Sequence, residues 1–237
     1  MIMKFINFKT ENEASDFVAK EIIEMIKQNP KINLGLATGS TPIPLYQALA
    51  NDFSINKTNW EKVQTFNLDE YLDLPDNHPQ TYRVFMNQHL FSKVNIDLNN
   101  THFPNPQENY DHLIDKLGGI DLQILGIGTN GHIGFNEPGS ELNSLTRIVD
   151  LTEETITTNA NKFFDGDTKL VPKQAISMGI DSILKAKKII LLAFGPTKKD
   201  VVKTLKNIKQ FDINFPASAL VLHPDVTIIT DDEANSF

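Results

Sequence analysis

The sequence predicts an α/β protein built around a mostly parallel β-sheet. Short apolar runs alternate with amphipathic stretches along the chain, which is the pattern of repeated β-α units. The length of 237 residues fits one large α/β domain. No internal repeat, low-complexity tract or linker divides the chain, so we predict a single domain over residues 1–237.

The first β-α unit has the clearest local signals. Residues 5–8 are predicted to form the first strand. Thr10 and Glu13 then make a capping box, in which each side chain satisfies a backbone N–H at the start of a helix. Apolar residues recur at helical spacing until Pro30, which cannot continue the helix. A long helix is therefore expected directly after the first strand.

The rest of the chain continues this alternation. Further strands are predicted at residues 32–36, 63–66, 122–125, 189–194 and 226–230, and helices at residues 43–50, 81–91, 109–117, 178–184 and 197–206. By contrast, residues 152–173 are polar and show no clear period. We predict that this segment is a mobile flap over the pocket.

The composition disfavours several classes of function. A net charge of -8 argues against binding to a nucleic-acid backbone, which needs clustered Lys and Arg. Neither a secretion signal nor an apolar run long enough to span a membrane is present. The chain has no cysteine, so disulfides, thiolate nucleophiles and Cys-type zinc sites are excluded. We expect a cytoplasmic enzyme.

The first candidate site follows the predicted strand at residues 32–36, because ligands of parallel sheets bind at the carboxyl ends of strands. Four small residues lie there before the helix: Thr38, Gly39, Ser40 and Thr41. Free amides and a helix dipole at such a turn favour an anion such as phosphate. Lys198 follows a later strand and would add positive charge. The alternatives are a capped turn without a ligand and a solvated lysine.

The second candidate site is the pair Asp69 and Glu70, which follows the strand at residues 63–66. Only one of the two adjacent side chains can face the crevice. A carboxylate in a partly dry pocket is a competent base for removing a proton from carbon next to a carbonyl or imine. The alternative is an aspartate that caps the next turn beside a solvated glutamate.

The third candidate site is the glycine-rich segment at residues 126–139. Its glycines match the G-x-G-x-x-G pattern of dinucleotide sites, but further Gly and Pro residues break the helix that such a site requires. What remains is a loop with three polar side chains suited to proton transfer: Asn130, His132 and Glu137. A structural histidine is the alternative. Ligand spacing does not support a metal site, and no G-x-S-x-G motif of serine hydrolases occurs.

Four motifs, ATGSTP at residues 37–42, FNLDEY at 66–71, GHIGFNEP at 131–138 and VPK at 171–173, together resemble those of glucosamine-6-phosphate deaminases. Their order and spacing extend over nearly the whole chain. The resemblance implies a three-layer, Rossmann-like α/β/α fold and an enzyme of amino-sugar catabolism. It also implies conversion of glucosamine 6-phosphate to fructose 6-phosphate and ammonia, without a cofactor.

The resemblance further implies roles for the proton-transfer residues. By position, Asp69 is the base that moves a proton from C2 towards C1 of the open-chain sugar. His132 is the acid-base group that opens the ring, and Asn130 and Glu137 are the partners that orient it.

For the phosphate, the resemblance implies binding by the loop from Thr38 to Thr41 and by Lys198. Lys162 stands where many members carry an arginine, and a lysine offers a point charge in place of a bidentate fork. Effector-regulated members carry basic residues shortly after the position of Arg147. Here valine and aspartate stand there, so effector control is not expected.

Two other functions stay open at this point. A 6-phosphogluconolactonase would use the same phosphate loop and a histidine base, but it would not need Asp69 to act at C2. A sugar-phosphate-sensing domain of a transcription regulator would need a basic helix-turn-helix, which the sequence does not show.

Overall fold

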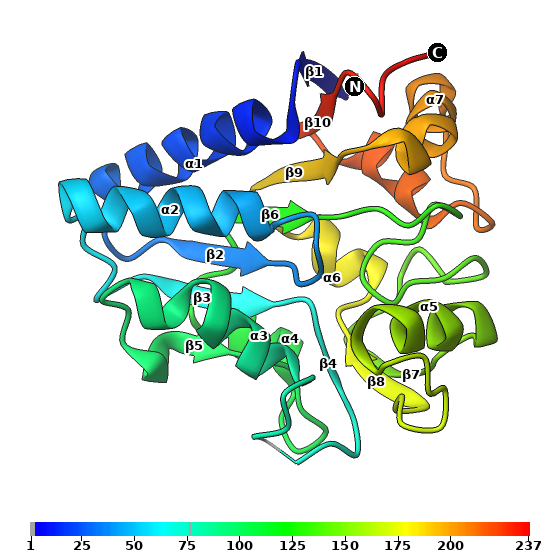
Figure 1. The fold of residues 1–237 in the computed structure, drawn as a ribbon, viewed down its shortest axis with the longest axis horizontal. Helices are drawn as coiled ribbons and strands as arrows, with labels where there is room; N and C mark the ends of the chain where they lie inside the picture. Colours follow the sequence, from blue (N-terminus) through cyan, green and yellow to red (C-terminus); the bar gives the residue numbers. More distant parts are fainter. Residues whose placement is uncertain (1–2, 76) are drawn as a thin grey trace.

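A computed structural model describes residues 3–75 and 77–237, and its centre is a seven-stranded parallel sheet. The strand order is β1-β10-β9-β6-β2-β3-β5, and every neighbouring pair runs parallel. The bounds are β1 Lys4–Phe8, β2 Asn33–Leu36, β3 Gln64–Asn67, β5 Thr101–His102, β6 Leu122–Leu125, β9 Lys188–Ala193 and β10 Val226–Asp231. The predicted parallel sheet is confirmed (Figure 1).

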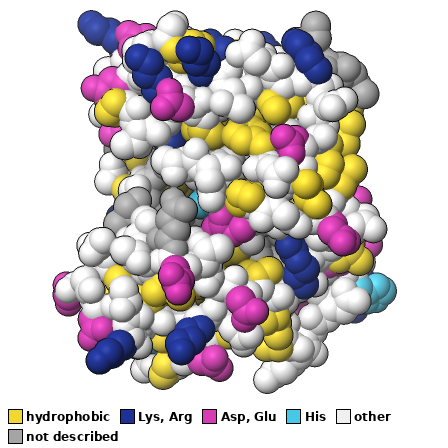
Figure 2. Space-filling view, turned by 90° about the vertical axis from the view of Figure 1, so that its right-hand side faces the viewer, with side chains coloured by type: hydrophobic (Ala, Val, Ile, Leu, Met, Phe, Trp, Pro, Cys, Tyr) yellow, Lys and Arg dark blue, Asp and Glu magenta, His cyan; other side chains and the backbone are white. Residues whose placement is uncertain are grey.

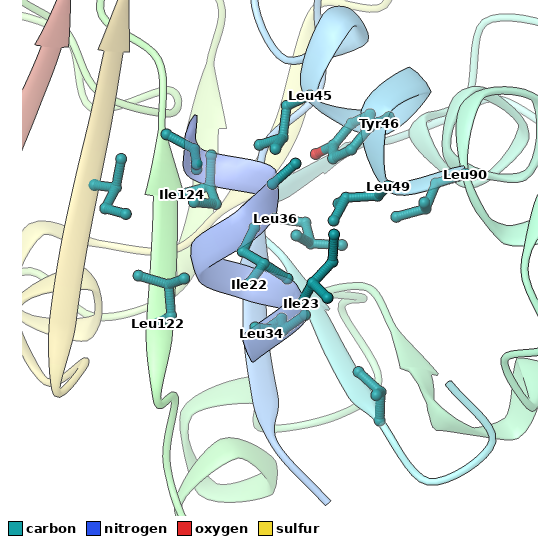
Figure 3. Close-up of a cluster of buried hydrophobic side chains, with 14 of the residues drawn as sticks. Ile22, Ile23, Leu34, Leu36, Leu45, Tyr46, Leu49, Leu90, Leu122 and Ile124 are labelled. Carbon is teal, nitrogen blue, oxygen red and sulfur yellow. The ribbon is translucent and has the colours of Figure 1, made fainter. Parts of the chain in front are cut away.

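Helices α1 (Glu11–Gln28), α2 (Ile43–Asn56) and α3 (Tyr82–His89) cover one face of this sheet. Their buried side chains pack on those of β2 and β6; Figure 3 shows Ile22 and Ile23 of α1 beside Leu34 and Leu36 of β2. Thr10 caps α1 by accepting a hydrogen bond from the backbone N–H of Glu13, as the capping box predicts.

Helices α4 (Tyr110–Lys116), α6 (Ile180–Leu184) and α7 (Lys199–Asn207) contribute to a second apolar cluster on the opposite face. The 3-10 turns are η1 (Phe91–Lys93), η2 (Leu98–Asn100), η3 (Pro196–Lys198) and η4 (Pro216–Leu222). The arrangement confirms the predicted three-layer α/β/α architecture. Within the part of the chain described, no helix is long and apolar enough to cross a membrane.

A second, smaller sheet lies beyond the carboxyl ends of the central strands (Figure 1). Its order is β4-β8-β7, and both pairs are antiparallel. The bounds are β4 Asp69–Tyr71, β7 Arg147–Asp150 and β8 Gln174–Ser177. This sheet was not predicted from the sequence, because DEY (β4), RIVD (β7) and QAIS (β8) lack the mainly apolar run that marks the equally short β2 and β6.

The segment predicted as a flap without a clear period contains a helix, α5 (Glu153–Phe163). Thr152 caps it by accepting a hydrogen bond from the backbone N–H of Thr155 at 3.2 Å. Ala160 and Phe164 are buried against Tyr71 and other residues of a third apolar cluster. The lack of a clear period in the sequence therefore did not exclude a helix, and the mobility of this segment stays a prediction.

Candidate active site

The four predicted site segments follow neighbouring strands of the central sheet. Lys198 comes after β9, the glycine-rich loop after β6, the loop from Thr38 to Thr41 after β2, and Asp69 after β3. Because the strands are parallel, their carboxyl ends meet at one edge. The arrows in Figure 1 point to this edge, and Figure 2 views it directly, with a histidine and acidic side chains near the middle of the face.

The glycine-rich loop is folded tightly around His132. The backbone N–H of Gly128 donates to the carbonyl of His132 at 2.9 Å, and that of Gly131 donates to the carbonyl of Gly128 at 3.0 Å. A Cβ at Gly128 would lie 2.2 Å from the imidazole Cε1, so only glycine fits against the ring. No helix begins at these glycines, as the sequence predicts.

The three polar side chains of the loop form one hydrogen-bonded group. His132 Nδ1 lies 2.8 Å from Asn130 Oδ1 and 3.4 Å from Glu137 Oε2. Asn130 Nδ2 donates to the same Glu137 oxygen at 2.8 Å. Since both groups facing Nδ1 are acceptors, the neutral imidazole carries its proton on Nδ1. Nε2 is then the atom with a free lone pair for acid-base work.

Glu137 is stabilised as a carboxylate. Burial by itself would raise its pKa, but the hydrogen bond and charge of His132, with hydrogen bonds from Thr155 and Asn130, outweigh burial and lower the pKa to about 2. The carboxylate beside Nδ1 favours the tautomer with its proton on Nδ1, which leaves Nε2 for proton transfer in ring opening.

The pKa of Asp69 is shifted in the opposite direction from that of Glu137. Its side chain is buried, with 7% of the residue exposed, and desolvation followed by the charge of Glu70 raises its pKa to about 8. The glycine-rich loop passes close by, since a Cβ on Gly134 would lie 3.6 Å from Asp69 Oδ2. The structure therefore brings Asp69 and the His132 loop together. A carboxyl group that titrates near neutral pH suits a general base.

Glu70 takes a structural role. Its carboxylate accepts hydrogen bonds from the backbone N–H groups of Tyr71 (2.9 Å), Tyr82 (2.8 Å) and Arg83 (3.0 Å). It thereby caps the amino end of α3. The alternative considered from the sequence was that Asp69 caps the next turn and Glu70 is solvated. In the structure Glu70 is the cap.

The phosphate-binding candidates lie at the same edge. Ser40 is exposed and Thr38, Gly39 and Thr41 are half-buried, directly before α2. Gly39 has φ of +95°, which favours glycine. Lys198 Nζ donates to the carbonyl of Ile127 at 2.6 Å, so this ammonium reaches the start of the glycine-rich loop. Lys162 lies in α5, but its side chain is outside the described part of the structure.

Two contacts of α5 were missed by sequence reasoning. The Thr155 hydroxyl donates to Glu137 Oε1 at 2.8 Å, and Asn159 Nδ2 donates to the Tyr71 hydroxyl at 2.7 Å. The signal that could have revealed the helix is Thr152 followed by two glutamates, a pattern of helix starts. The local sequence does not indicate which residues the helix contacts.

A cavity of about 550 Å³ lies beside the site and is lined by the end of the glycine-rich loop, at Phe135, Glu137, Pro138 and Gly139. Arg147, Val149 and Asp150 also line this cavity, whereas Asp69 and the phosphate loop do not. The cavity therefore does not coincide with the group of residues proposed for chemistry. Among the described residues, no three acidic or histidine side chains cluster as a metal site would require.

Comparison with known sequences agrees with this geometry. The family model described as glucosamine-6-phosphate isomerases/6-phosphogluconolactonase matches residues 8–229. A glucosamine-6-phosphate deaminase of Staphylococcus epidermidis is 48% identical over 241 aligned positions, covering 98% of each chain. One from Clostridium perfringens is 47% identical over 240 positions, again covering 98% of each.

Solved structures agree as well. A monomeric glucosamine-6-phosphate deaminase is 39% identical, with a TM-score of 0.93 over 99% of both chains. A 6-phosphogluconolactonase from Thermotoga maritima, 20% identical with a TM-score of 0.74 over 97% of this chain and 99% of that one, shows only that the fold is shared. The match over most of the chain and the nearly 50% identity to full-length relatives establish that the chain belongs to the glucosamine-6-phosphate isomerase/6-phosphogluconolactonase family.

Proposed function

We propose that this protein is an isomerising glucosamine-6-phosphate deaminase, which converts glucosamine 6-phosphate and water to fructose 6-phosphate and ammonia. The observation that carries the proposal is the buried Asp69, with its raised pKa, beside the His132 loop. A base at carbon is needed for this reaction and not for hydrolysis of a lactone. The full-length relatives named as deaminases support the same function.

The proposed reaction begins with ring opening. His132 Nε2 takes the proton of the C1 hydroxyl and returns it to the ring oxygen as the C1–O5 bond breaks, which leaves the aldehyde. Glu137 stabilises the imidazolium that forms in between, and Asn130 keeps Nδ1 protonated.

The second stage is proton transfer between carbons. The Asp69 carboxylate removes the proton from C2, the electron pair forms a C1=C2 double bond, and the aldehyde oxygen takes up a proton, which gives an enolamine. Return of the C2 proton to C1, with loss of one proton from the nitrogen, gives the C2 imine and a C1 hydroxyl. Water then adds to C2 and ammonia leaves, so one C–N bond is broken for each water consumed. By this balance the enzyme is formally a hydrolase. We further propose the cytoplasm as its location, since the substrate is a charged sugar phosphate.

The function is tested by measuring ammonia release from glucosamine, galactosamine and mannosamine 6-phosphates, with hydrolysis of 6-phosphogluconolactone in parallel. We expect ammonia from the glucosamine ester and no lactone hydrolysis above the uncatalysed rate. Rapid lactone hydrolysis without release of ammonia would instead indicate the lactonase activity of the more distant family branch.

Phosphate binding gives a second prediction. Replacing Lys198 with Ala is expected to raise KM about 10- to 150-fold, because one charge-assisted hydrogen bond contributes roughly 1.5–3 kcal/mol. Lys203→Ala, at an exposed position of α7, is the matched control and should keep the wild-type KM. A fall in kcat with unchanged KM would assign Lys198 only to holding the Ile127 carbonyl.

A further inference from the structure

One face of helix α5 contacts Glu137 and the strand that carries Asp69. Thr155 donates to Glu137, and Asn159, four residues later, donates to Tyr71. Tyr71 lies in β4, two residues after Asp69. Residues four apart share a helix face, so this face of α5 is directed to the site. Both side chains are half-buried, whereas Thr158 is exposed.

The hydrogen bonds around Glu137 have defined directions. The Thr152 hydroxyl, which caps α5, donates to Thr155 Oγ1 at 3.0 Å, and the Thr155 hydroxyl in turn donates to Glu137 Oε1 at 2.8 Å. The second carboxylate oxygen, Oε2, accepts from Asn130 and lies 3.4 Å from His132 Nδ1. The carboxylate is therefore held by the helix through one oxygen and by the glycine-rich loop through the other.

We propose that Thr155 is a positioning residue, which holds Glu137 Oε1 from helix α5 and so fixes the carboxylate that orients His132. The proposal rests on the proposed function. The terminal torsion of a glutamate is broad, so a carboxylate bonded through one oxygen rotates more freely than one bonded through both. Glu137 Oε2 also accepts from the Asn130 amide, whose Oδ1 is the nearest acceptor to Nδ1, so loss of the Thr155 hydroxyl would leave this acceptor less firmly held. The packing of α5 against Glu137 is thereby coupled to ring opening by His132.

The proposal is tested with two substitutions at one position. Thr155→Val keeps the size and branching of the side chain but removes the hydroxyl, and we expect kcat for ammonia release to fall about tenfold with KM little changed. Thr155→Ser restores the hydroxyl and should recover most of the loss. Thr158→Val makes the same chemical change on the exposed side of α5 and should keep the wild-type kcat.

A second readout does not depend on turnover. With ¹⁵N-labelled histidine, the ring nitrogens of His132 report which nitrogen carries the proton, and Thr155→Val is expected to reduce the fraction protonated at Nδ1. Wild-type kcat and an unchanged His132 spectrum in Thr155→Val would overturn the proposal. The proposal would also be overturned if Thr155→Ser lost as much kcat as Thr155→Val. Failure of the wild-type protein to release ammonia would reject the proposed function, while the spectrum would still test the contact.

Discussion

Asp69→Asn is expected to abolish both ammonia release and exchange of the C2 hydrogen with solvent. Asparagine keeps the shape of the buried side chain but cannot accept a proton from carbon, and the loss should exceed about 10⁴-fold. Deuterium incorporation at C2 and ammonia release would be measured at equal concentrations of folded protein. Asp73→Asn, at an exposed position of the following loop, is the matched control and should retain activity.

The wild-type pH profile follows from the same residue. Burial, with a smaller contribution from Glu70, raises the pKa of Asp69 to about 8. Only the carboxylate form removes the C2 proton, so kcat/KM should rise with pH up to about that value and then level. A profile that is flat from about pH 6 to 9 would contradict the assignment of Asp69 as the base.

Asp69→Asn should also stabilise the folded protein while it removes activity. The pKa of Asp69 is raised from 3.8 to about 8, so the folded state binds this proton more tightly than the unfolded chain does. Its contribution to stability is fully present below the unfolded value and is lost as pH rises through the folded value. In urea unfolding, the gap between variant and wild type should widen from about pH 4 to pH 8, to on the order of 5 kcal/mol. A gap that does not change with pH would contradict this.

His132→Gln is expected to lower turnover by about 10² to 10⁴-fold but to leave measurable activity. Hexosamine rings open slowly in water without help, so the variant can still capture the small open-chain fraction of the substrate. No comparable bypass exists for proton transfer at C2. Ammonia release should therefore be limited by the supply of open-chain sugar, and C2 exchange should persist in proportion to that supply.

The two variants separate the two proton-transfer roles. His112→Gln, on α4, serves as a histidine control outside the site and should be fully active. If Asp69→Asn kept wild-type C2 exchange while His132→Gln lost it entirely, the assignments of base and ring-opening group would have to be exchanged.

The sequence alone determined six of the seven strands of the central sheet, its main helices and the segments at its functional edge; the two-residue β5 was not predicted. The signals there are local: the capping box of Thr10 and Glu13, the breaks at Pro30, and apolar runs long enough to show a period. The rule that parallel strands direct their carboxyl ends to one edge then places Asp69, His132 and Lys198 at the same side of the sheet. No knowledge of side-chain contacts is needed for these steps.

Only the tertiary structure decided how those segments meet. Strand β4 pairs with β8, which lies more than a hundred residues later in the chain, and neither strand has the mainly apolar run that marks β2 and β6. The choice between Asp69 and Glu70 depends on which carboxylate reaches the amino end of α3. The bond from Thr155 to Glu137 depends on where α5 packs. Such contacts join residues distant in sequence, so local propensity carries no information about them.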